Sequence, residues 1–138
     1  MFVDASAMLA ILLEEPEGRA LAEALETPSS PPVTSVVAAW EAAVGLYRKK
    51  RIPMAKAEAR LREFLAQAKV EVVPLSMEEF TAALGAFERY GRHRYPEAER
   101  NRALNLADCF HYASAKTRDM PMLHKDQGLS LTDLASVS

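Results

Sequence analysis

Four acidic residues stand where a carboxylate could take part in chemistry. Asp4 follows a short apolar segment, Glu41 lies inside the apolar stretch SVVAAWEAAVGLY, Asp108 follows ALNLA, and Asp126 follows MPMLHK. Burying an ionised carboxylate without a partner is costly, so proteins neutralise such a group, pair it or give it a metal. Glu41 in particular needs a partner that its own segment does not contain.

A divalent cation would allow these four carboxylates to share one pocket. Without a cation, like charges at short range raise each other's pKa values or push the chain apart. Oxygen ligands favour Mg²⁺ or Mn²⁺ over zinc, and the single cysteine, Cys109, cannot build a cysteine-based zinc site. One or two such ions would activate water against a phosphodiester.

Each candidate also has a structural explanation. Asp4 and Asp108 suit the first turn of a helix, where acidic side chains cap free amides, and Asp126 lies in the turn sequence KDQG. A small rotation of its helix would turn Glu41 toward solvent. His111 lies three residues after Asp108, and His124 ends a strand, so a mixed histidine and carboxylate metal site is an alternative. We expect instead that His111 points outward.

Short apolar runs alternate with stretches of helical period, which is typical of a parallel sheet covered by helices. We expect strands at 1–3, 33–34, 70–74 and 120–124, and helices at 6–13, 18–25, 35–51, 53–69, 76–90 and 105–115. The polar segment 91–103 is predicted to be a mobile surface loop. Functional groups of parallel sheets collect beyond the carboxyl ends of the strands, so the four acids would meet at one edge.

Composition limits the class of protein. The 138 residues, about half of them apolar, predict one α/β domain spanning 1–138. The net charge of -2 gives no overall electrostatic footprint for nucleic acid, so a polyanion would have to be held locally. One cysteine, no apolar run of about 20 residues and no basic secretory signal predict a soluble cytoplasmic protein without a membrane span.

Three segments carry a family resemblance: MFVDASAMLAILLEE, TSVVAAWEAAVGL and ALNLADCFHYASAKTRDMPMLHKDQGLSLTDL. Together they resemble PIN-domain ribonucleases of the VapC toxin type, over essentially the whole chain. The resemblance implies an α/β/α sandwich around a short parallel sheet and an endoribonuclease that depends on Mg²⁺ or Mn²⁺. It also implies a toxin that forms homodimers and is inhibited by a cognate antitoxin.

The resemblance assigns roles to individual residues. Asp4 and Asp108 match the two principal metal ligands, Glu41 matches the acid on the helix after the second strand, and Ser6 matches a hydroxyl near the first acid. Relatives usually read Lys-Gly-Asp/Asn-Asp-Phe after the last strand, whereas this chain reads KDQGL from 125 to 129. Asp126 therefore fills the fourth position after a small loop shift, or the site works with three acids and water. Asp133 is interpreted as structural.

Basic residues of the segment before the Asn105 helix are candidates for binding RNA: Arg92, His93, Arg94, Arg100 and Arg102. The alternative is a solvated loop without a ligand. The helix 53–69, together with Leu46 and Tyr47, is a candidate association surface.

A rival function is a catalytically silent binding module for RNA or a protein. A haloacid-dehalogenase-like phosphatase is disfavoured, because it requires Asp-x-Asp after the first strand and this chain has Ser6.

Overall fold

Four short parallel strands form the centre of the computed structural model, which describes residues 1–28 and 30–134. They are β1 (Phe2–Val3), β2 (Val33–Ser35), β3 (Glu71–Val73) and β4 (Met122–Leu123), in the order β3-β2-β1-β4. Phe2 is in register with both Val33 and Met122. The predicted parallel sheet is confirmed, and β1 lies inside it, so the residue after Val3 emerges at the middle of the carboxyl edge. The expected domain limit of 138 falls beyond the described residues.

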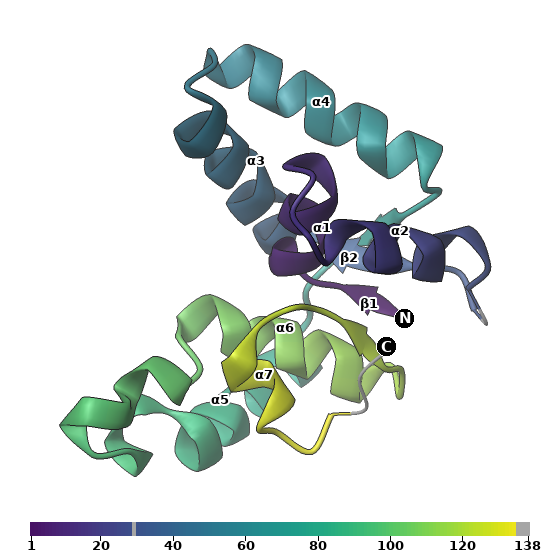
Figure 1. The fold of residues 1–138 in the computed structure, drawn as a ribbon. Helices are drawn as coiled ribbons and strands as arrows, with labels where there is room; N and C mark the ends of the chain where they lie inside the picture. The colour runs from purple at the N-terminus through teal and green to yellow at the C-terminus, as the bar shows by residue number, and fades with distance from the viewer. Residues whose placement is uncertain (29, 135–138) are drawn as a thin grey trace.

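Helices cover both faces of the sheet (Figure 1). One group comprises α1 (Ala5–Leu12), α2 (Gly18–Glu26), α3 (Val36–Lys50) and α4 (Met54–Gln67), and the other comprises α5 (Met77–Tyr90), α6 (Leu106–Thr117) and α7 (Gln127–Ser130). This arrangement is the expected α/β/α sandwich. Of the described helices, none has both the length and the apolar composition needed to cross a membrane.

Local capping explains where the helices begin. The Asp4 carboxylate accepts the Ser6 N–H at the start of α1, and the Ser35 hydroxyl accepts the Ala38 N–H at the start of α3. Ser76 and Glu79 form a capping box at the start of α5. These side chains satisfy amides that have no partner inside the helix, and they fix α1 and α3 directly after a strand and α5 a few residues after one.

Close packing of α1 against α3 determines where Glu41 lies. Gly45 is one helical turn beyond Glu41, and a Cβ added there would lie 2.5 Å from the Leu9 side chain. The absence of a side chain therefore lets α3 approach the helix that begins at Asp4. Leu46 is 1% exposed, so the expectation that Leu46 contributes to an association surface is wrong. Its side chain is used in packing within the chain.

The segment 91–103 is not the loop that the sequence predicts. It contains two 3-10 helices, η1 (Arg92–Arg94) and η2 (Glu97–Arg102). Pro96 precedes η2, where its fixed φ suits a helical start. Beyond η2, Leu104 is buried and donates its N–H to the Tyr90 carbonyl, 2.9 Å away. The segment is therefore fixed to the end of α5 immediately before α6 begins.

Candidate active site

Asp4 lies at the carboxyl end of β1 and is almost completely buried. Its Oδ2 accepts hydrogen bonds from the Ser6 N–H, at 3.0 Å, and from the Ser6 hydroxyl, at 2.6 Å. Its Oδ1 is buried and has no hydrogen-bond partner among the described residues. A buried carboxylate oxygen without a partner costs free energy, so Asp4 has one oxygen committed to the fold and one available to a ligand.

Asp108 approaches Asp4 from the first turn of α6. Its Oδ2 accepts the Asn105 N–H at 3.4 Å, and its own N–H donates to Asn105 Oδ1 at 2.8 Å, which makes a capping box. Burial, together with the negative charges of Asp126 and Asp4, raises the pKa of Asp108 to about 7, although the Asn105 hydrogen bond and the charge of His111 act in the opposite direction. Three carboxylates therefore interact electrostatically, as the positions of the acids predict.

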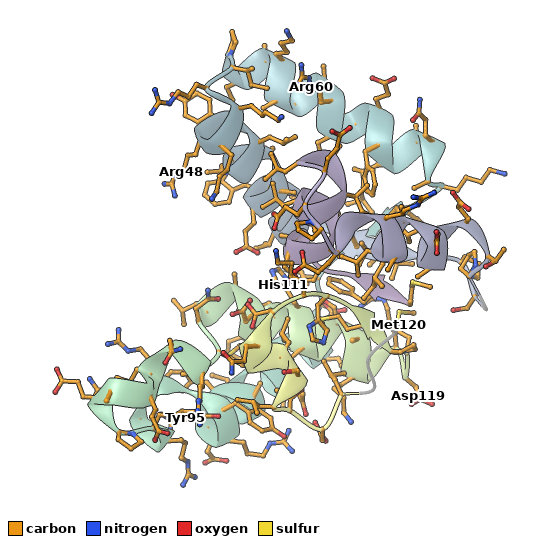
Figure 2. All side chains as sticks on the ribbon, viewed as in Figure 1. Arg48, Arg60, Tyr95, His111, Asp119 and Met120 are labelled. Atoms are coloured by element: carbon orange, nitrogen blue, oxygen red, sulfur yellow. The ribbon has the colours of Figure 1, made fainter. Side chains whose placement is uncertain are left out.

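The partner of Glu41 is His111, whose Nε2–H donates to Glu41 Oε1. The same Nε2 lies 3.8 Å from Asp4 Oδ1. Burial lowers the pKa of His111, but the hydrogen bond to Glu41 and the charges of Asp4, Glu41 and Asp108 outweigh burial and raise it overall. Figure 2 shows His111 at the junction of the two helical layers.

The expectation that His111 points outward is therefore wrong. Its side chain is fully buried, and its ring stacks on Phe2 with centroids 5.9 Å apart. α6 is buried on most sides, so the ring has an apolar surface to pack against and acidic groups to bond. The signal in the sequence was the spacing of three residues between Asp108 and His111, which places both on one side of a helix.

The side chains at this edge fit a divalent cation. Ligand atoms of Asp4, Asp108 and His111 all lie within 4.8 Å of one another. The partnerless Asp4 Oδ1 and the raised pKa of Asp108 both indicate negative charge that the protein alone does not compensate. The carboxylate oxygens of Asp4 and Asp108 are therefore suited to a metal ion, and His111 Nε2 lies beside them, bonded to Glu41.

Ser6 connects the ends of β1 and β4. Its hydroxyl donates to Asp4 and accepts the Lys125 N–H at 3.0 Å. Lys125 itself forms ion pairs with Glu15 and Glu17. The contacts of Ser6 therefore orient the Asp4 carboxylate, and its expected contact with substrate stays a prediction.

Asp126 caps α7, because its Oδ1 accepts the Leu129 N–H at 3.1 Å. Its charge nevertheless reaches Asp108, whose pKa it raises. A Cβ at Gly128 would lie 3.0 Å from the Arg102 carbonyl oxygen, so a glycine there lets α7 approach the end of η2 closely. The KDQG segment thus places a fourth carboxylate near the cluster, and its catalytic role stays a prediction.

The basic residues expected to bind substrate have different surroundings. Arg92 and Arg100 line a hollow of about 310 Å³ with Asn105, next to the N-terminus of α6. Arg94 Nε donates to the Glu88 carbonyl at 2.7 Å, and Arg102 pairs with Glu99 at 3.2 Å. His93 instead packs its ring against Phe87. Arg92 and Arg100 therefore lie beside the start of the helix that carries Asp108.

Asp133 has the contacts of a structural residue. Its Oδ1 accepts the Tyr112 hydroxyl at 2.6 Å and the Tyr90 hydroxyl at 3.4 Å, and its Oδ2 pairs with Lys116 at 3.2 Å. These bonds hold the segment after α7 against α5 and α6.

Comparisons with known proteins agree with this architecture. The PIN domain family model matches residues 1–134. A protein named Ribonuclease VapC from Mycolicibacterium smegmatis is 33% identical over 138 residues, which cover 99% of each chain. A VapC ribonuclease from Rhizobium meliloti is 35% identical over 96% of this chain and 98% of its own length.

Two solved structures share the fold. Mycobacterium tuberculosis VapC20, described as a Sarcin-Ricin loop cleaving toxin, superposes with a TM-score of 0.72 at 16% identity, over 99% of this chain and 97% of its own. A chain of a toxin-antitoxin complex from Klebsiella pneumoniae gives a TM-score of 0.67 at 17% identity, over 99% of this chain and 95% of its own. With an acidic cluster at the carboxyl edge of a parallel sheet and relatives that match over their full length, the chain belongs to the PIN domain family, in its VapC group.

Proposed function

We propose that the protein is a metal-dependent endoribonuclease that acts as the toxin of a toxin–antitoxin pair. The observation that carries the proposal is the buried, partnerless Asp4 Oδ1 beside Asp108 and His111. The names of the relatives, Ribonuclease VapC and VapC ribonuclease, support RNA as the substrate. An RNA substrate in turn supports action in the cytoplasm.

The acidic and basic side chains would have different roles in RNA cleavage. A bound Mg²⁺ or Mn²⁺ would lower the pKa of a water molecule and offset charge on the phosphate oxygens. Asp4 and Asp108 would hold the ion, and Ser6 keeps the Asp4 carboxylate oriented. Glu41 and Asp126 would position the ion or accept the proton of the attacking water. Arg92, Arg94 and Arg102, together with Arg100 beside Arg92 in the hollow, would bind phosphates of the RNA.

Replacing a ligand carboxylate by an amide tests this proposal. Asp4→Asn and Asp108→Asn keep an oxygen that can cap the helix but remove the charge, so metal-dependent cleavage of a mixed RNA pool should fall by more than about 100-fold while the fold persists. EDTA should abolish cleavage by the wild-type protein. The matched control is Asp119→Asn, labelled in Figure 2, an exposed acid whose φ of 50° asparagine also tolerates. Unchanged cleavage in both ligand variants would contradict the assignment.

A catalytically silent binding module is the second candidate function. It is favoured by the divergent KDQG segment, in which Asp126 uses one oxygen to cap α7. If wild-type protein binds RNA but cleaves none in Mg²⁺ or Mn²⁺, this second candidate replaces the first.

The proposed protein partners are an antitoxin and a second copy of the chain. Trp40 and Met54 are exposed beside a hollow of about 520 Å³ between α3 and α4, which offers an antitoxin an apolar surface. Phe80, Leu84 and Phe87 are exposed on one face of α5, and this face offers a second copy of the chain a separate apolar surface. Sedimentation velocity at about 100 µM, a concentration where weak dimers form, measures self-association, and a strict monomer would contradict the dimer.

A further inference from the structure

Glu41 is connected to the acidic cluster through His111, and it comes from a different helical layer than Asp108. It belongs to α3, whereas Asp108 and His111 belong to α6, and the hydrogen bond from His111 to Glu41 joins residues 70 positions apart. We propose that His111 is a positioning residue, whose Nε2 hydrogen bond holds the Glu41 carboxylate beside the cluster of Asp4 and Asp108 and thereby sets how tightly the site binds a divalent cation. This inference rests on the proposed function.

The ring of His111 is fixed before any ligand arrives. It is fully buried, and it stacks on Phe2, which belongs to the central strand β1, with an angle of 28° between the ring planes. In this orientation Nε2 faces both Glu41 Oε1 and, at 3.8 Å, Asp4 Oδ1. Nδ1 is buried and has no hydrogen-bond partner among the described residues. The bonding capacity of the ring is therefore concentrated at Nε2.

The nitrogen that faces the cluster is already engaged. While Nε2–H donates to Glu41, Nε2 has no electron pair to offer a metal ion. The ring therefore acts through the carboxylate that it holds. This separates our inference from a site in which histidine is itself a ligand, although His111 lies close enough to Asp4 and Asp108 for either role.

Glu41 needs such support more than the other acids do. Asp4 and Asp108 are fixed by helix caps, whereas Glu41 has a longer side chain that is 28% exposed and is bonded to His111. Without this bond the carboxylate gains rotamer freedom and access to water. Removing a residue that orients a ligand typically weakens metal binding by roughly 10- to 100-fold.

Two amide substitutions separate the bond from the bulk of the ring. In His111→Gln the amide nitrogen is as many bonds from Cβ as Nε2 is, whereas in His111→Asn the amide nitrogen reaches only the Nδ1 position. We expect His111→Asn to weaken Mn²⁺ binding roughly 10- to 100-fold, measured by titration calorimetry without RNA, and His111→Gln to stay within about threefold of wild type. Thermal unfolding in EDTA verifies the fold. If the asparagine variant does not fold, His111→Phe keeps the ring stack and removes both nitrogens.

A double-mutant cycle with Glu41→Ala decides between positioning and direct ligation. If His111 acts through Glu41, His111→Asn should cause no further loss of Mn²⁺ affinity in the Glu41→Ala background. A full further loss there, or ¹⁴N coupling to bound Mn²⁺ in pulsed electron paramagnetic resonance, would overturn the inference, as would unchanged affinity in the single variant. The proposed function fails separately, if wild-type protein binds Mn²⁺ but cleaves no RNA.

Discussion

The carboxylates of Asp4 and Asp108 each have two roles at once. One oxygen of each accepts a backbone N–H at the start of a helix, and this bond fixes the direction of the whole carboxylate. The second oxygen of Asp4 is buried and has no hydrogen-bond partner in the part of the chain that the structure describes. The capping explanation and the metal explanation are therefore not alternatives, because the cap orients the oxygen that a cation would use.

The raised pKa of Asp108 predicts how the metal-free protein responds to pH. A folded-state pKa of about 7 lies above the value in the unfolded chain, so ionisation opposes folding as the pH rises from about 4 to 7. In EDTA, wild-type protein should therefore lose stability over this range, and Asp108→Asn should lose less. We expect the variant to be more stable relative to wild type at pH 8 than at pH 4 by about 4 kcal/mol, measured by urea unfolding.

The same measurement on Asp119→Asn provides the control, since that acid is exposed and stands apart from the cluster. A stability difference between Asp108→Asn and wild type that is identical at both pH values would show that Asp108 ionises normally in the fold.

Sequence reasoning grouped the acids but expected their histidine to point outward. Asp4 follows a strand and Asp108 begins a helix, so their positions are determined by local signals and by the parallel topology. His111 lies in ADCFHYASA, where nearly every neighbour is small or apolar. A helix that is buried on most sides has no polar face to establish its orientation, so the side toward which His111 points depends on the assembled fold.

At the scale of elements, the starts of helices were the most predictable feature. Ser35, Ser76 and Asn105 cap α3, α5 and α6 as expected, because capping depends on a few adjacent residues. The 3-10 helices η1 and η2 and the four-residue α7 were not predicted. Such short elements have weak propensities of their own and are held by contacts with distant segments, such as the close approach of Gly128 to Arg102.

Two glycines should respond in opposite ways to alanine. A Cβ at Gly18, the first residue of α2, would lie 2.4 Å from the Ala10 carbonyl oxygen of α1, so Gly18→Ala should destabilise the protein by about 1–3 kcal/mol. Gly85 in α5 has no atom within 4 Å of the added Cβ, so Gly85→Ala should stabilise it by about 0.5–1 kcal/mol. Urea unfolding measures both, and a gain of stability in Gly18→Ala would show that α1 and α2 are not packed as described.

At the scale of the whole molecule, charge is distributed unevenly. The net charge of -2 gives no overall electrostatic footprint for nucleic acid, and the site itself is acidic. Arg92 and Arg100 nevertheless line a hollow beside Asn105, at the end of α6 that also carries Asp108. An RNA strand that reaches the acids would thus meet cations and a helix N-terminus there, and local charge rather than total charge would decide whether it binds.

Charge reversal of Arg92 and Arg100 tests whether this local positive charge binds RNA. In Asp4→Asn protein, which should bind RNA without cutting it, Arg92→Glu with Arg100→Glu should weaken binding of single-stranded RNA. The slope of log K against log salt should become shallower by about 1.4, since each of the two lost phosphate contacts removes about 0.7. The matched control, Arg60→Glu with Lys56→Glu, reverses two exposed charges on α4, the helix that carries the labelled Arg60 away from His111 in Figure 2. It should leave the slope unchanged, whereas equal slopes for both double variants would place the RNA elsewhere on the protein.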